Sequence, residues 1–213
     1  MILHSKPWIS KEDIEAVNNS LKNGMIGQGD MVANFEENIS NYIGTQDTVI
    51  TGSGTEALIL ALLALEIGVG DEVILPTYVC HSVADAIIAV GATPVFCDSG
   101  QYWVVTPEAV LEKISSKTKA IIVVHIYSIM ADIELFLGFG LPIIEDCCQA
   151  FGANNGISMA GSKGIISVFS FHATKCLTTG EGGAVTSSDQ LIMDKIRSIK
   201  VCFIQELPIS RPP

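Results

Sequence analysis

Apolar and polar positions follow two different periods along this chain, one typical of strands and one typical of helices. Short apolar runs bounded by turn residues predict buried strands, and they lie at residues 48–51, 72–75, 94–97, 120–124, 143–144 and 165–169. Apolar residues spaced three or four positions apart predict amphipathic helices at residues 10–24 and 30–43. Further helices are predicted at 57–65, which is strongly apolar, at 82–90, 132–139 and 189–200, and from Pro107 onward. Because strands alternate with helices, the sequence predicts βαβ units and an α/β fold around a mainly parallel sheet.

Residues suited to helix termini support these boundaries. Ser10 is a favourable N-cap, and Asp13, three positions later, can bond back to its backbone. Gly24 and Gly44 are the expected stops of the first two helices, because glycine readily adopts the left-handed conformation that ends a helix. The sequence contains no internal repeat and no interdomain linker.

A lysine lies in the segment SFHATKCLTTGEGGA at residues 170–184, directly after the predicted strand at 165–169. A buried strand delivers the residues after it to a pocket, and an ammonium group removed from water is costly unless it is paired or neutralised. A desolvated lysine with a lowered pKa is suited to form a Schiff base with a carbonyl cofactor. The alternative is that Lys175 is a solvated loop lysine, because most lysines are exposed.

A glycine-rich turn, GSGTE at residues 52–56, joins the predicted strand at 48–51 to the apolar helix at 57–65. Such a turn presents free backbone N–H groups and the positive end of the helix dipole, which together suit a phosphate group. Ser53 and Thr55 would add hydroxyl donors. A tight turn from strand to helix needs glycine in any case, so a purely structural turn is the alternative.

Two acids, Glu145 and Asp146, follow the short apolar strand at 143–144. Ligands of open α/β sheets bind just beyond such strand ends, and a carboxylate there can pair with the pyridinium nitrogen of pyridoxal 5'-phosphate (PLP). The alternative is that Asp146 caps the next turn. His125 also follows a predicted strand and could line the same pocket, although a structural histidine with satisfied hydrogen bonds is the more common case.

Taken in this order, the turn at 52–56, the acids at 145–146 and the lysine segment at 170–184 resemble the DegT/DnrJ/StrS family of PLP-dependent sugar aminotransferases. The resemblance extends over residues 11–189, and its most specific part is the TTGEGGA tail of the lysine segment. It implies the three-layer α/β large domain of fold-type I PLP-dependent transferases.

The resemblance also sets an expectation for domain organisation. Family members continue with more of the large domain and a small C-terminal domain that closes over the substrate. We therefore expect residues 1–200 to form an incomplete PLP-binding large domain, with the small C-terminal domain missing. Residues 201–213 do not match the family pattern and are expected to form a tail.

The resemblance implies a role for each matching residue. Lys175 is the lysine of the internal aldimine and the acid/base that moves a proton between the substrate Cα and the cofactor. Asp146 pairs with the pyridine nitrogen, and Gln149 lies near the ring hydroxyl. The phosphate is held by residues of the glycine turn and of the strand end, namely Gly54, Thr55 and Ser170.

Two cysteines depart from the family pattern. Cys80 stands where many members have an aromatic residue that stacks on the cofactor ring, and a polarisable sulfur can pack against the ring instead, so Cys80 is included among the cofactor contacts. Cys176 follows the lysine where an amide is common. Neither change removes a group that the chemistry requires. Lys175 itself distinguishes the chain from the related sugar dehydratases, which have histidine at that position.

The resemblance implies the transfer of an amino group, usually from glutamate, to a keto group on a nucleotide-linked sugar in sugar or polysaccharide biosynthesis. The expected partners are an amino-acid donor and a keto-sugar nucleotide. A homodimer is also expected, because active sites in the family lie at subunit interfaces.

Two other functions are compatible with the sequence. A donor carboxylate usually binds an arginine fork, and the two arginines, Arg197 and Arg211, lie away from the motifs. This favours a truncated, non-catalytic protein that binds PLP or serves a regulatory or interaction role. Another fold-type I reaction, such as that of a lyase or a desulfurase, is disfavoured by the TTGEGGA segment.

The amino-acid composition indicates which kinds of partner the chain can bind. The net charge of −11 is opposite to that of a nucleic-acid-binding surface. Hydrophobic residues make up 48% of the chain and charged residues only 16%, which indicates that part of the surface is covered by a partner.

Location and metal binding are also addressed by the sequence. No apolar run approaches the ~18–20 residues that span a bilayer, and the N-terminus lacks a signal-peptide core, so a cytoplasmic location without membrane association is expected. The six cysteines have no CxxC pair or histidine spacing typical of zinc sites. We therefore expect reduced thiols and no metal.

Overall fold

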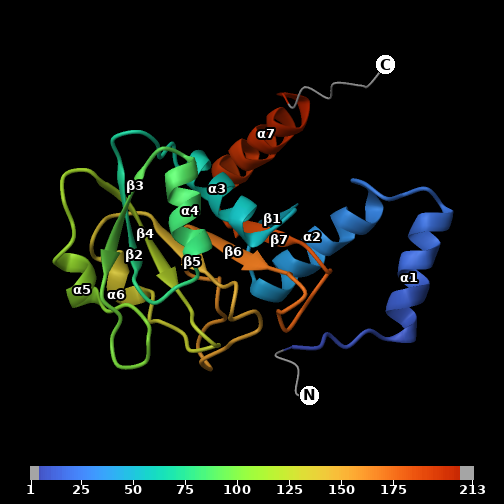
Figure 1. The fold of residues 1–213 in the computed structure, drawn as a ribbon, viewed down its shortest axis with the longest axis horizontal. Coiled ribbons are helices and arrows are strands. Elements are labelled where there is room, and N and C mark those ends of the chain that lie inside the picture. The colour runs from blue at the N-terminus through green and yellow to red at the C-terminus, as the bar shows by residue number, and fades with distance from the viewer. Residues whose placement is uncertain (1–4, 207–213) are drawn as a thin grey trace.

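A seven-stranded sheet forms the centre of the computed structural model, which describes residues 5–206 of the chain (Figure 1). The strands are β1 (Asp47–Thr51), β2 (Glu72–Pro76), β3 (Thr93–Cys97), β4 (Thr118–Val124), β5 (Ile143–Asp146), β6 (Ile166–Ser170) and β7 (Gly183–Ser187). Their order across the sheet is β1-β7-β6-β5-β4-β2-β3. All adjacent pairs are parallel except those that β7 makes with β1 and β6. The predicted α/β fold with a mainly parallel sheet is confirmed.

Helices cover both faces of this sheet, giving three layers (Figure 1). They are α1 (Lys11–Lys22), α2 (Asp30–Ile43), α3 (Gly54–Ala64), α4 (His81–Ala89), α5 (Pro107–Leu111), α6 (Glu134–Leu137) and α7 (Gln190–Glu206). One core contains side chains of α3, α4 and α7. Residues of α5 and α6 pack on the opposite side of the sheet. Helix α2 packs with a third cluster that includes the buried Phe169 and Phe171.

Alternation along the strands explains how one sheet serves two cores. Val73 and Leu75 of β2 contact the α3 side, whereas Ile74 between them contacts the α5 and α6 side. Side chains of successive strand residues point to opposite faces. A strand covered on both sides therefore reads as a continuous apolar run, which is the pattern that predicted these strands.

Helix α3 is apolar on all sides because it is surrounded. Its sequence, GTEALILALLA, contains seven buried residues, and it packs against β6, β7, α4 and α7. A helix that is hydrophobic all round is expected in a core. Its rigid packing fixes the position of its N-terminus at the carboxyl edge of the sheet.

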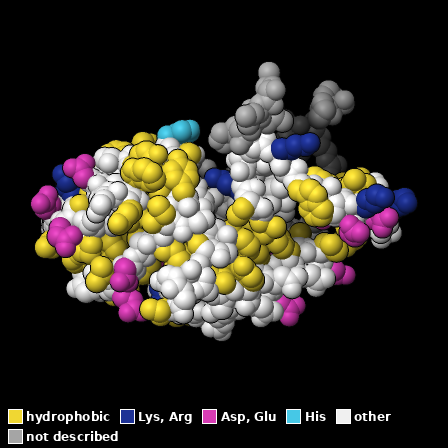
Figure 2. All heavy atoms as spheres, turned by 90° about the horizontal axis from the view of Figure 1, so that it is seen from below, with side chains coloured by type: hydrophobic (Ala, Val, Ile, Leu, Met, Phe, Trp, Pro, Cys, Tyr) yellow, Lys and Arg dark blue, Asp and Glu magenta, His cyan; other side chains and the backbone are white. Residues whose placement is uncertain are grey.

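Helix α1 projects away from this body (Figure 1). The predicted capping box is present, since Ser10 Oγ accepts from the N–H of Asp13 at 3.1 Å and Asp13 Oδ2 accepts from the N–H of Ser10 at 2.8 Å. No residue of α1 is buried, and Ile14 and Val17 are exposed. Figure 2 shows hydrophobic side chains across much of one face of the molecule, as the high apolar content led us to expect.

Three elements differ from the sequence prediction. Strand β7 was not predicted, because its sequence, GAVTS, carries a weak apolar signal and its place depends on pairing with the distant β1 as well as with the preceding β6. Strand β5 extends through Glu145 and Asp146. Helix α7 continues past Lys200 to Glu206, and the first residue beyond Lys200 that disrupts helices is Pro208. Of the predicted tail, residues 207–213 lie outside the described part of the chain.

Arg197 of α7 connects three elements. Its guanidinium donates to Asp47 at 2.7 and 3.2 Å, to Glu36 at 3.2 Å and to the carbonyl oxygen of Thr48 at 2.9 Å. Burial of the guanidinium opposes ionisation, but the bonds to Asp47 and Glu36 outweigh it and raise the pKa of Arg197. The side chain thus joins α7 to β1 and α2.

Replacing this group should destabilise the fold. We expect Arg197→Met to lower the free energy of unfolding by about 2 kcal/mol, because it leaves two partly buried carboxylates without their charged donor. Urea denaturation with an unchanged m-value would measure the loss. Lys195→Met is the matched control: Lys195 lies on the same helix and pairs only with the exposed Glu66. An equal loss in both variants would contradict the assigned role of Arg197.

Candidate active site

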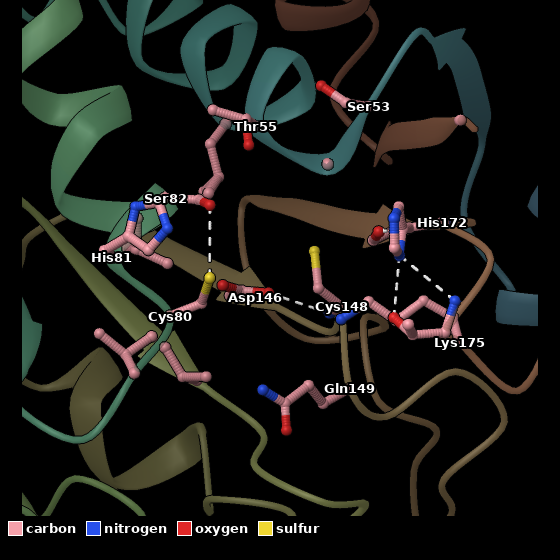
Figure 3. A pocket seen from close by; sticks show the side chains of 18 of the residues that line it. Ser53, Thr55, Cys80, His81, Ser82, Asp146, Cys148, Gln149, His172 and Lys175 are labelled. Atoms are coloured by element: carbon pink, nitrogen blue, oxygen red, sulfur yellow. Dashed lines mark hydrogen bonds between the residues drawn. The ribbon is translucent and has the colours of Figure 1, made fainter. Parts of the chain in front are cut away.

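A cavity of about 490 Å³ opens at the carboxyl ends of β5 and β6, beside the N-termini of α3 and α4 (Figure 3). The cavity is lined by all seven residues that were predicted from the sequence to contact the cofactor: Gly54, Thr55, Cys80, Asp146, Gln149, Ser170 and Lys175. In Figure 3, Asp146 and Cys148 lie in the middle, with Lys175 on one side and Cys80 on the other. The structure brings these residues together, and their individual roles stay predictions.

Asp146 is a buried acid at the end of β5. Only 4% of the residue is exposed, and its Oδ1 accepts a hydrogen bond from the N–H of Cys148 at 2.9 Å. Burial raises its pKa, whereas the bonds from Cys148 and the charge of Lys175 act in the opposite direction. The carboxylate is therefore costly to ionise here, and a cation bound in the cavity would reduce that cost.

The first turn of α3 forms another wall of the cavity. Ser53 Oγ accepts from the N–H of Glu56 at 3.1 Å, while Glu56 Oε2 accepts from the N–H of Gly52 at 2.7 Å. This reciprocal pair fixes the turn. The N–H groups of Gly54 and Thr55 belong to the first turn of a helix, where they have no intrahelical acceptor.

Gly54 is required by close packing rather than by a special backbone angle. A Cβ at this position would lie 2.9 Å from Sγ of Cys148 and 3.0 Å from Cβ of Ser170. The missing side chain therefore lets the start of α3 approach the ends of β5 and β6. The structural and the phosphate-binding interpretations of the glycine turn are therefore compatible. The turn is needed for packing, and it also leaves backbone donors at the cavity.

Lys175 follows β6 in a tight local structure. Its N–H donates to the carbonyl oxygen of His172 at 2.9 Å. The glycine-rich tail folds back on Phe171, whose N–H donates to Gly182 at 2.8 Å and whose carbonyl oxygen accepts from Thr179 at 3.0 Å. Lys175 is partly buried and lines the cavity, so it is not a freely solvated loop lysine.

Gln149 and Cys80 lie at the margins of the cavity. The Oε1 atom of Gln149 is buried and has no hydrogen-bond partner among the described residues. A buried acceptor without a donor is unfavourable unless a ligand supplies one. Cys80 is exposed, and its Sγ lies 3.3 Å from Oγ of Ser82, the second residue of α4.

Further residues line the cavity that the sequence did not single out, notably His81, Cys148 and His172. His172 Nδ1 accepts from the N–H of Thr174 at 3.2 Å and lies 2.9 Å from its hydroxyl. His172 lies within the segment at 170–184, and Cys148 lies between the expected site residues Asp146 and Gln149. His81 directly follows Cys80, but its place in the cavity depends on how α4 meets the sheet.

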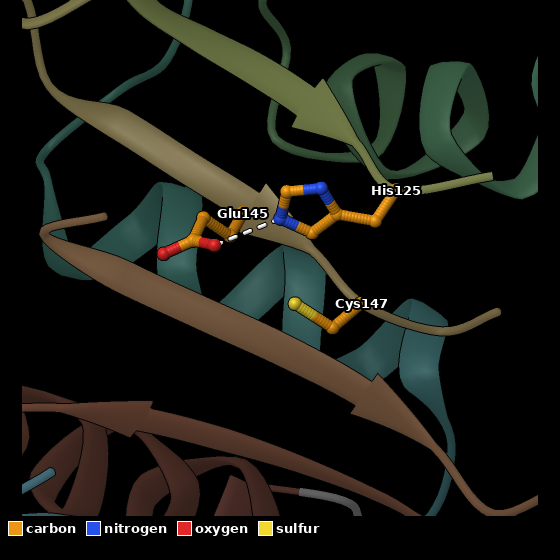
Figure 4. A group of neighbouring side chains, drawn as sticks. All are labelled: His125, Glu145 and Cys147. Atoms are coloured by element: carbon orange, nitrogen blue, oxygen red, sulfur yellow. Dashed lines mark hydrogen bonds and ion pairs between the residues drawn. The ribbon is translucent and has the colours of Figure 1, made fainter. Parts of the chain in front are cut away.

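His125 does not line the cavity and is a buried structural residue (Figure 4). Its Nδ1 accepts from the N–H of Ala131 at 3.1 Å, so Nε2 carries the proton that it shares with Glu145 at 2.8 Å. Glu145 also accepts from the N–H groups of Gly161 at 2.9 Å, Lys163 at 2.7 Å and Gly164. The structural alternative for His125 is thus the correct one.

His125 and Glu145, together with Cys147, also have the side-chain types that bind metal ions. Ligand atoms of His125, Glu145 and Cys147 lie within 4.8 Å of one another. However, the ring and carboxylate are already engaged by protein hydrogen bonds, and burial raises the pKa of the Cys147 thiol, which disfavours the thiolate a metal needs. The hydrogen bonds of His125 and Glu145 instead hold β4, β5 and the loop that leads to β6 together.

Comparison with known proteins gives a consistent result. The sequence model of the DegT/DnrJ/EryC1/StrS aminotransferase family matches residues 7–207. The chain is 37% identical over 203 residues to the spore coat polysaccharide biosynthesis protein SpsC of Bacillus subtilis, covering 93% of this chain and 52% of that protein. It is 38% identical over 201 residues to the GDP-perosamine synthase of Escherichia coli O157:H7, covering 92% and 55%.

A solved structure agrees closely in fold. The PLP-form of Spr1654 from Streptococcus pneumoniae superposes with a TM-score of 0.87 at 31% identity, over 97% of this chain and 58% of that one. The chain spans about half the length of the curated relatives it matches. The similarity supports the fold-type I large domain. Within the described residues, no helix is both long and apolar enough to cross a membrane.

The hydrogen bonds to Glu145 predict that the free energy of unfolding depends on pH. Burial alone would raise the pKa of Glu145, but the bonds from His125, Gly164 and Gly161 outweigh it and lower the pKa below its usual 4.5. A lowered pKa contributes stability that is complete above pH 4.5 and is lost as the pH falls through the folded-state value.

We therefore expect Glu145→Gln to lower the free energy of unfolding by about 3 kcal/mol at pH 7, because an amide cannot accept all four bonds. The difference from the unmodified chain should shrink below pH 4.5. Urea titrations at pH 7 and pH 4 would measure both effects, with the exposed Glu134→Gln as control. A penalty that does not change with pH would rule out an ionised Glu145 as its source.

Proposed function

The chain belongs to the DegT/DnrJ/EryC1/StrS aminotransferase family, and on that premise we propose that it forms the cofactor-binding part of a PLP-dependent aminotransferase. The reaction is the transfer of an amino group from an amino acid, glutamate, to a keto group on a nucleotide-linked sugar. The observation that carries the proposal is a single cavity lined by Lys175, Asp146 and the first turn of α3.

The first turn of α3 suits the phosphate of PLP. Its N–H groups at Gly54 and Thr55 lie at the positive end of a buried helix dipole, where an anion is stabilised. The hydroxyl groups of Thr55 and Ser170 line the same cavity. These local donors offset the net charge of −11, which would otherwise repel a phosphate.

The remaining residues suit the pyridine ring. Asp146 is buried, and burial raises its pKa, so a pyridinium nitrogen beside it would supply the missing positive partner. The unpartnered Oε1 of Gln149 can accept a bond from a ring hydroxyl. Cys80 lines the cavity, and we assign its sulfur to packing on the ring, at the position where many family members have an aromatic residue.

Bound in this way, PLP acts as an electron sink for the substrate Cα. Lys175 Nζ would hold the cofactor and would serve as the acid/base that moves a proton at the substrate Cα. Asp146 would pair with the pyridine nitrogen and favour its protonated form. Ser170, Gly54 and Thr55 hold the phosphate, so that the ring keeps one orientation through both halves of the reaction.

The names of relatives support the acceptor class. One similar protein is named for GDP-perosamine synthesis and another for spore coat polysaccharide biosynthesis. We therefore assign a keto sugar nucleotide as the acceptor. The proposal includes a homodimer in the cytoplasm, and the five cysteines at positions 80, 97, 147, 148 and 176 are free thiols, as is usual in a reducing compartment.

One observation favours a second candidate, a chain that binds PLP without turnover. A donor carboxylate usually needs an arginine, and among the described residues none of those lining the cavity is an arginine. Arg197 is engaged by Asp47 and Glu36. In this candidate, the cofactor binds at Lys175 but glutamate does not react.

A two-step experiment separates the two candidates. The purified chain is incubated with PLP, reduced with borohydride and mapped by mass spectrometry. We expect one adduct at Lys175, its loss in Lys175→Ala and its retention in Lys163→Ala, because Lys163 pairs with Glu134 outside the cavity. Unreduced holoprotein is then mixed with glutamate, and conversion of PLP to pyridoxamine phosphate is followed by absorbance.

The outcomes discriminate clearly. An adduct with conversion supports the aminotransferase, and an adduct without conversion supports binding alone. No adduct on a folded chain, or labelling that persists in Lys175→Ala, would reject the proposed site. With the site established, Lys175→Ala should reduce conversion by at least a thousandfold, because both the covalent link and the proton carrier are removed.

Asp146 allows an independent test. Its raised pKa means that, above the usual value of 3.8, ionisation destabilises the folded chain relative to the unfolded one. We expect Asp146→Asn to raise the melting temperature of the cofactor-free chain at pH 7 and to abolish most of the further increase that PLP gives. Thermal melts with and without PLP measure both shifts. An increase on PLP addition as large as that of the unmodified chain would contradict the pairing.

A further inference from the structure

Three aromatic side chains form an exposed cluster outside the cofactor cavity. Tyr78 is 45% exposed, Trp103 is 51% exposed and Tyr127 is 60% exposed. Their ring centroids lie 6.0 to 6.5 Å apart. Large aromatic groups left together in water favour a ligand that covers them.

The cluster is held in place by strained backbone and by a hydrogen bond. Trp103, Tyr127 and the adjacent Ser128 have φ angles of 62°, 49° and 65°, in the left-handed region that bulky residues rarely adopt. The hydroxyls of Tyr78 and Tyr127 lie 3.3 Å apart. Strain of this kind persists where the surrounding structure imposes it, and it concentrates at ligand-binding sites.

Two of the three ring pairs meet edge to face, and the third, Tyr78 with Trp103, is tilted at 38°. The planes of Trp103 and Tyr127 cross at 87°, and those of Tyr78 and Tyr127 at 68°. No ring lies flat on another, and all three residues are about half exposed, so ring surface stays open to a ligand. A flat ligand can therefore stack on a ring without separating the three.

Sheet topology places this cluster in line with the cofactor cavity. Tyr78 follows β2, Trp103 lies in the loop after β3 and Tyr127 follows β4. These strands are parallel to β5 and β6, so all five present their carboxyl ends at one edge. The order β6-β5-β4-β2-β3 separates Lys175 from the cluster by about two to four strand spacings, or roughly 10–19 Å.

The two sites also share a loop contact. The N–H of Ser128 donates to the carbonyl oxygen of Gln149 at 3.1 Å, and Gln149 lines the cavity. On the other side, Val79 lines the cavity directly after Tyr78. An elongated ligand that enters the cavity can therefore continue along the same edge to the aromatic rings.

We propose that Tyr78, Trp103 and Tyr127 bind the nucleobase of the acceptor by stacking, while its sugar reaches the cofactor cavity. This inference rests on the proposed function, which requires a ligand with a sugar at one end and a base at the other. The neutral rings do not oppose the binding of a base in a chain of net charge −11. A diphosphate lies between the two ends and spans the interval along the sheet edge.

Tryptophan fluorescence tests this without cofactor or turnover. The chain has two tryptophans, so a Trp8→Phe variant reports on Trp103 alone. We expect GDP or UDP to quench its fluorescence saturably, whereas inorganic diphosphate and ribose 5-phosphate do not. Adding Tyr127→Ala should weaken nucleotide binding about tenfold, the effect of losing one stacked ring. Tyr102→Ala is the matched control, because Tyr102 is 62% exposed but lies outside the ring cluster.

Several results would overturn the proposal. These are no saturable quenching by either nucleotide, equal quenching by diphosphate, or equal weakening by Tyr127→Ala and Tyr102→Ala. If dilution of the chain alone changes Trp103 fluorescence and Trp103→Ala dissociates a dimer, the cluster is covered by a second copy instead. Borohydride labelling of Lys175 in each variant verifies the fold. Nucleotide binding without any labelling would reject the proposed function while leaving this site intact.

Discussion

The site depends on the burial of two successive carboxylates at the end of one strand. Because side chains alternate along β5, Glu145 points to one side of the sheet and Asp146 to the other. Glu145 receives bonds from His125 and three backbone N–H groups, which compensate its charge within the protein. Asp146 receives a backbone bond from Cys148 and remains undercompensated, facing the cavity. Glu145 thus stabilises the fold around β5, whereas the buried charge of Asp146 favours the binding of a cationic ligand.

The hydrogen bonds of Glu145 therefore also help to position the residues of the cavity. The loop held by Glu145 runs directly into β6, and β6 delivers Ser170 and then Lys175. The start of α3 is pressed against the same strand ends by the absence of a side chain at Gly54. Packing across the sheet consequently sets the distances between the lysine, the acid and the helix terminus.

Much of this could be predicted from the sequence, where the information is local. The capping pair Ser10 and Asp13, the stop at Gly44 and the buried strands all follow from short-range patterns. The lysine segment and the glycine turn identified cavity residues because each motif is continuous. Long-range arrangements could not be predicted in this way. Strand β7 depends on pairing with β1 and β6, and the meeting of Tyr78, Trp103 and Tyr127 depends on the order of three strands in the sheet.

The insertion of β7 between β1 and β6 has a consequence for synthesis on the ribosome. Residues 47–51 can complete their pairing only when residues 183–187 have emerged, beginning 132 residues after Thr51. Until then, β1 lacks its partner strand, and α3 lacks the cover of α7. The nascent chain must carry this apolar surface until β7 and α7 are synthesised, which makes folding dependent on slow long-range pairing and exposes the chain to aggregation.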